Sequence, residues 1–153
     1  MNLESSKKAQ SQLMAHVFML LFSVMILALV LTTLNNIKQQ YQEFVADLEI
    51  DEVCDTIKEG VGKIYWPTDY SGPKTVKMGE IEILLPVRVG DVKYKAIFAG
   101  STLNIATVDK PYVNDSCKMG FDAIFNGQTS GGLAKLTWTA YSNGTDEINM
   151  TII

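Results

Sequence analysis

The residues that carry most enzyme chemistry are scarce in this sequence and lie far apart. Its 153 residues include one histidine, His16, and two cysteines, Cys54 and Cys117. His16 lies in an uncharged stretch, so the rest of the chain cannot assemble a Ser-His-Asp or Cys-His catalytic group. We interpret His16 as a snorkelling or helix-facing residue, with a proton relay as the alternative. The sequence therefore predicts a protein that is not an enzyme and needs no cofactor.

Carboxylates are the other residues that could bind a metal or transfer protons. An acidic run extends from Glu43 to Glu59. A calcium-binding EF-hand loop that began at Asp47 would need Gly at position 52 and Glu at position 58, where this chain has Glu and Lys. We therefore predict no metal site and interpret the run as the solvated face of a helix. Glu80 and Glu82 share one face of a predicted strand and remain a weak candidate carboxylate pair.

An uncharged apolar segment dominates the first part of the chain. No Asp, Glu, Lys or Arg occurs from Leu13 to Leu34. A helix of that length spans roughly 33 Å, enough to cross a hydrocarbon layer of about 30 Å. A cleaved secretory signal would end in a small-residue site, and a buried core helix would show a polar stripe; neither pattern is present. We therefore predict a retained transmembrane helix.

The charges flanking this segment predict its orientation. Lys7 and Lys8 precede the segment and Lys38 follows it, and basic residues are retained on the cytoplasmic side. The N-terminus is therefore predicted to be cytoplasmic and the C-terminal domain extracellular. Residues 1–38 carry one acidic and three basic residues, or +2, so a net charge of −4 leaves −6 on the remainder. A domain of that sign would repel phosphate backbones, so we expect no nucleic-acid partner.

Two features agree with an extracellular location. Cys54 and Cys117 both follow the membrane segment, and such a pair in an oxidising compartment predicts a disulfide, with two buried free thiols as the alternative. Three candidate N-glycosylation sequons begin at Asn114, Asn143 and Asn149. Together they predict an outer domain that is stabilised by a disulfide and carries glycans.

Apolar periodicity extends the helix beyond the lipid. Ile37, Tyr41, Phe44 and Leu48 recur at helical spacing, which we expect to turn one apolar face inward. Ile50, Val53, Ile57 and Val61 continue slightly out of phase, and Gly60 and Gly62 are the predicted stop. We therefore expect one helix from about Leu13 to Ile57.

The remainder alternates between strand-forming runs and turn signals. Six strands are predicted, at Val76–Leu85, Val92–Ala99, Leu103–Val108, Phe121–Phe125, Leu133–Ser142 and Ile148–Ile153. Turns are expected at several dipeptides, including Gly90-Asp91, Asn126-Gly127 and Asn143-Gly144. The predicted fold class is α+β, with a long N-terminal transmembrane and amphipathic helix followed by a small antiparallel β-sheet or β-sandwich.

These patterns divide the chain into four regions. Residues 1–12 form a cytoplasmic leader, residues 13–34 a transmembrane or filament-core helix, residues 35–60 its amphipathic extension, and residues 61–153 an extracellular β-rich domain. No long linker separates the helix from this domain.

Lys7-Lys8-Ala9-Gln10 stands directly before an apolar helix that is retained. This leader resembles the class III signal of archaeal type IV pilins and archaellins. The resemblance implies that a prepilin peptidase cuts after Ala9 and leaves Gln10 as the new N-terminus. Family members commonly carry Glu five positions into the mature chain, where this sequence has Met14.

A second segment is also similar to this family. Leu85-Pro86, Gly90 and Tyr94 resemble a Leu-Pro…Gly…Tyr segment of archaeal pilin-like domains. The resemblance implies a pilin or minor pilin. Such a subunit polymerises with identical copies through its N-terminal helix, after insertion in the lipid bilayer. Its other partners would be the peptidase, a membrane assembly platform and the surface layer.

Two alternatives remain open. The chain is also compatible with a membrane-anchored archaellum stator-like or envelope-binding protein with an external β-sandwich, which needs no cleavage. An anchored enzyme or ligand-binding domain is the third alternative, and a deep pocket with converging polar groups would distinguish it.

Overall fold

The computed structural model describes residues 3–67, 70, 72–109 and 112–153, with side chains described from Gln12 onward. The chain divides into two compact units, residues 1–40 and residues 41–153. One long helix, α1 (Leu3–Ile64), contributes to both units, and seven strands follow it. The predicted α+β class is therefore confirmed.

Helix α1 extends beyond both predicted ends. Gly60 and Gly62 do not stop it, because tertiary packing outweighs their low helix propensity. A Cβ atom at Gly60 would lie 3.0 Å from side-chain atoms of Ile83 and Leu136, so the missing side chain lets the helix approach the sheet closely. The helix ends at Ile64, just before Pro67, which cannot continue a helix.

The strands form one hydrogen-bonded sheet. The sequence left a single β-sheet and a β-sandwich open, and the structure has the single sheet. The strands are β1 (Val76–Leu85), β2 (Tyr94–Ala99), β3 (Thr102–Thr107), β4 (Asn114–Lys118), β5 (Ile124–Thr129), β6 (Gly132–Ala140) and β7 (Asp146–Ile152). Their order is β1-β6-β7-β5-β2-β3-β4. All pairs are antiparallel except β5 with β7, which is parallel.

Two strand predictions were wrong in detail. Strand β4 was not predicted, because its sequence Asn-Asp-Ser-Cys-Lys is polar and poor in β-branched residues. It forms by pairing with β3 along its whole length. The turn predicted at Asn126-Gly127 is part of β5 instead, since both residues pair with β7.

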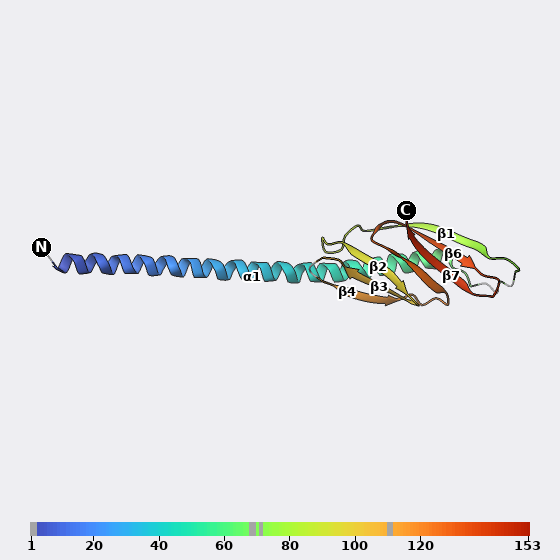
Figure 1. The fold of residues 1–153 in the computed structure, drawn as a ribbon, viewed down its shortest axis with the longest axis horizontal. Coiled ribbons are helices and arrows are strands. Elements are labelled where there is room, and N and C mark those ends of the chain that lie inside the picture. Colours follow the sequence, from blue (N-terminus) through green and yellow to red (C-terminus); the bar gives the residue numbers. More distant parts are fainter. Residues whose placement is uncertain (1–2, 68–69, 71, 110–111) are drawn as a thin grey trace. The chain divides into compact units, whose positions relative to one another are not determined.

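The core of the second unit lies between the C-terminal part of α1 and one face of the sheet. Figure 1 shows the cyan-to-green part of the helix passing behind the strands. The helix buries one row of residues there, and β6 buries alternate residues. The largest fully buried side chains are Tyr94, Phe125, Ile50, Ile57, Leu85, Leu103, Ile105, Leu136, Ile148, Met150, Val53 and Val61.

Candidate assembly surfaces

The first unit is an exposed apolar helix. Every residue from Gln12 to Gln40 is exposed, and the described residues contain one candidate membrane-spanning helix, near the N-terminus. The leader residues Lys7, Lys8, Ala9 and Gln10 belong to helix α1. Their side chains are outside the described part of the structure, which for side chains begins at Gln12.

The four polar side chains of the charge-free stretch from Leu13 to Leu34 form hydrogen bonds within the helix. Ser23 Oγ donates to the Met19 carbonyl at 2.8 Å, and Thr33 Oγ1 donates to the Leu29 carbonyl at 2.8 Å. Thr32 and His16 likewise contact carbonyl oxygens one turn earlier. Such bonds to the preceding turn remove the cost of placing hydroxyl groups in lipid. The segment is thus fitted to an apolar environment.

The exposed apolar row of α1 corrects a prediction. We expected Ile37, Tyr41, Phe44 and Leu48 to face inward. Instead Tyr41, Phe44 and Leu48 are 67%, 61% and 55% exposed. The sheet covers the neighbouring, out-of-phase row, which comprises Ala46, Ile50, Val53, Ile57 and Val61. The second unit therefore leaves uncovered the row formed by Tyr41, Phe44 and Leu48, which we call the apolar row.

The disulfide prediction is confirmed. Cys54 of α1 and Cys117 of β4 are bonded, with their Cα atoms 6.4 Å apart and a sequence separation of 63. The bond ties the helix to the edge strand that sequence reasoning missed. Cys54 is buried, whereas Cys117 is half-buried.

All three sequon asparagines are exposed. Asn114 begins β4, and Asn149 lies on β7 between the buried Ile148 and Met150. Asn143 lies in the turn between β6 and β7, where its Oδ1 accepts bonds from the backbone nitrogen and hydroxyl of Thr145 at 3.1 and 2.7 Å. Each side chain is accessible to solvent, and their glycosylation stays a prediction.

The Leu-Pro…Gly…Tyr segment forms a clamp between the helix and the β1–β2 loop. The buried Tyr94 hydroxyl donates to the Pro86 carbonyl at 2.8 Å, and burial raises the pKa of Tyr94 to about 12. Gly90 N donates to Glu49 Oε2 of α1 at 2.6 Å. Gly90 has a φ of 54°, in the left-handed region that favours glycine. The segment thus has a structural role in holding the loop on α1.

Replacing Gly90 with alanine is expected to destabilise the second unit by at least about 2 kcal/mol. The new Cβ atom would lie 2.8 Å from both Ala46 Cβ and the Gln42 carbonyl. Gly100→Ala is the matched control, because Gly100 also has a positive φ but has nothing within 4 Å of the added atom. It should cost only about 1 kcal/mol. Chemical denaturation followed by tryptophan fluorescence measures the free energy of unfolding of both variants. Equal losses of stability would contradict the structural role of the Gly90 loop.

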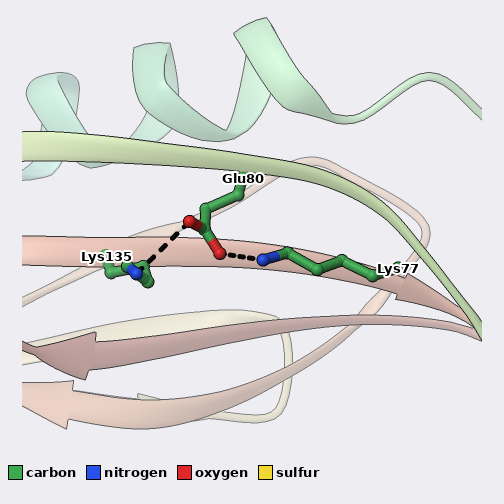
Figure 2. Close-up of polar contacts among 3 residues, drawn as sticks. All are labelled: Lys77, Glu80 and Lys135. Carbon is green, nitrogen blue, oxygen red and sulfur yellow. Dashed lines mark hydrogen bonds and ion pairs between the residues drawn. The ribbon is translucent and has the colours of Figure 1, made fainter.

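Glu80 is the centre of an ion-pair group on the outer face of the sheet. It contacts Lys77 of its own strand, and its Oε1 lies 3.2 Å from Lys135 Nζ of β6 (Figure 2). Hydrogen bonds from these two lysines lower the pKa of Glu80. Glu80 is therefore held ionised, which does not suit a proton-sharing carboxylate pair with Glu82.

The remaining concave surfaces are open. One cavity of about 410 Å³ is lined by Tyr65, Asp122 and Asp146, among others. Tyr65 donates to the Asp122 carbonyl at 2.7 Å, and Trp138 Nε1 donates to Asp146 Oδ1 at 3.1 Å. Burial, and then the nearby Asp146, raise the pKa of Tyr65. Within the described part of the chain, no three His, Cys, Asp or Glu side chains are grouped to hold a metal ion.

Comparisons with known proteins do not assign a family. No family model matches the chain, and neither a curated protein nor a solved structure matches it significantly. What the structure itself establishes is an apolar N-terminal helix followed by a disulfide-bonded, mostly antiparallel β-sheet, an architecture consistent with a pilin-like protein.

Proposed function

We propose that the chain is a structural subunit, a pilin or minor pilin, of an archaeal type IV pilus-like surface filament. The observation that carries this proposal is the apolar row of Tyr41, Phe44 and Leu48, which the second unit leaves exposed. It follows a segment that is already long enough to cross a membrane.

A simple anchor does not account for the apolar row. About 20 apolar residues suffice to cross the hydrocarbon layer, and the charge-free segment from Leu13 to Leu34 supplies them. An anchored monomer would expose Tyr41, Phe44 and Leu48 to water. Packing between identical helices would bury all three side chains, at roughly 1.5–3 kcal/mol each before the cost of association. The row therefore favours helix-to-helix assembly.

The leader supplies a route into such a filament. Lys7 and Lys8 hold the N-terminus at the cytoplasmic lipid surface, and the small side chain of Ala9 admits the prepilin peptidase. The cut leaves Gln10 first, and the apolar helix passes from lipid into the filament core with the help of an assembly platform. Because Met14 replaces the usual Glu, helix register in this filament is set by shape.

The second unit suits the outside of a filament. Its disulfide closes a long loop, and the asparagines of its three sequons are exposed. The surface layer is the expected neighbour. The net negative charge of the second unit again argues against nucleic acid as a partner.

Mass spectrometry of the protein from its native cells tests this proposal. We expect a mature N-terminus at Gln10 and recovery of the protein in sheared filaments. Ala9→Phe should block cleavage, whereas Met14→Leu, five residues beyond the cut, should be processed normally. An intact leader on a protein confined to membranes would reject the filament subunit and favour the anchored envelope-binding alternative.

A further inference from the structure

Strand β1 is the open edge of the sheet. It stands at one end of the strand order, is ten residues long and, among the described residues, pairs only with β6. Unpaired backbone N–H and C=O groups on such an edge are a template for another strand. The opposite edge, β4, is only five residues long, is tethered by the disulfide and begins with a sequon. Pairing with another chain is therefore favoured at β1.

The side chains of β1 are arranged asymmetrically along the strand. Basic residues lie at its start, with Lys74 just before it and Lys77 within it, and the acidic residues Glu80 and Glu82 lie further on. Glu80 is neutralised inside the molecule by Lys77 and Lys135 (Figure 2). Glu82 has no ion-pair partner among the described residues.

Exposed apolar side chains accompany this charge pattern. Leu84, near the end of β1, is 77% exposed, and Val76 and Met78, near its start, are also exposed. Each end of the strand therefore offers apolar surface beside a charge, and the charges at the two ends have opposite sign.

We propose that β1 pairs antiparallel with β1 of a second copy of this chain. An antiparallel pair sets the start of each strand against the end of the other. In the register that places Lys77 of each copy opposite Glu82 of its neighbour, Lys77 exchanges Glu80 for Glu82. Lys135 remains the partner of Glu80. In that register Leu84 lies opposite Thr75, at the start of the neighbouring strand. A parallel, in-register pair would instead place like charges side by side, which is unfavourable. The irregularity between Lys77 and Gly79 lies near the start of β1, and the regular part of the strand extends from Gly79 to Leu85.

A groove at the end of β1 extends this complementarity. A cavity of about 440 Å³ lies between Glu49 and Glu52 of α1 and the segment Leu84–Val87. In the antiparallel arrangement the start of the partner's strand, with Lys74, reaches this acidic rim. The contact is between folded outer units, so it holds whether the chain is a filament subunit or a membrane anchor.

Zero-length carbodiimide cross-linking of the full chain in mild detergent tests the pairing. An equal mixture of ¹⁴N- and ¹⁵N-labelled copies should yield mixed-mass peptides that join Lys77 to Glu82. Within one extended strand these residues are about 16 Å apart, too far for a zero-length bond. Mixed-mass links that omit β1, or no mixed-mass links at all, overturn the proposal.

A charge exchange gives a second measurement. Lys77→Glu and Glu82→Lys should each weaken the association of outer units by about tenfold, and the double variant should restore it. Energy transfer between labelled copies measures this, with Gln128→Lys, exposed on β5, as the matched control. A double variant as weak as the single ones, or a control equally weak, shows that β1 is not the contact.

Discussion

Loss of the Cys54–Cys117 disulfide is expected to lower the free energy of unfolding of the second unit by about 4 kcal/mol. The bond closes a loop with a sequence separation of 63, so its removal frees a long segment of the unfolded chain. A domain of this size has a total stability of roughly 5–15 kcal/mol. Urea denaturation with and without reductant, followed by tryptophan fluorescence, measures the loss.

The variant Cys54→Ala/Cys117→Ala separates the bond from the thiols. It should match the reduced protein to within about 1 kcal/mol. Because Cys117 anchors β4 to the helix, we expect backbone amides of β4 and its partner β3 to exchange hydrogen fastest after reduction. Equal denaturation midpoints for the oxidised and reduced proteins would contradict the prediction.

Local patterns account for the elements that the sequence predicted well. The strand expected at Val76–Leu85 has those bounds in the structure, and alternate residues of β6 are buried because strand side chains alternate between faces. The disulfide followed from the compartment that the charge-free segment predicts. The strand patterns depend on residues within each strand, and the disulfide was inferred from the oxidising compartment around the domain.

Long-range contacts explain what the sequence did not predict. Two apolar rows of similar helical spacing run along α1, and periodicity cannot tell which one a sheet covers. The sheet covers the row of Ile50, Val53 and Ile57, because Gly60 and the Gly90 loop allow close approach on that side. Strand β4 and the parallel pairing of β5 with β7 likewise depend on partners distant in sequence.

The candidate surfaces were only partly predictable for the same reason. The cysteines and sequons are visible as residue types, and all of those asparagines are exposed in the structure. The apolar row was visible as a pattern but was assigned to the core. The open edge of β1 depends on strand order, which no local signal determines.

Replacing Phe44 with aspartate is expected to abolish filaments while leaving the second unit folded. Phe44 is exposed in the monomer and contributes nothing to the core, so stability should change by less than about 0.5 kcal/mol. In a filament, the change removes apolar burial and places a charge between helices. A loss of about 4 kcal/mol per subunit would raise the subunit concentration needed for assembly by about a thousandfold.

Electron microscopy of sheared filaments, with immunoblotting of membrane fractions, checks this outcome. Phe44→Leu is the conservative control and should retain filaments, and Gln128→Asp places the same charge on an exposed position of β5. The comparison distinguishes the two main functions, because an anchored monomer has no use for Phe44. Filaments of normal abundance with Phe44→Asp would mean that the apolar row faces water in the assembled state. The charge-free segment alone would then have to supply the contacts between subunits.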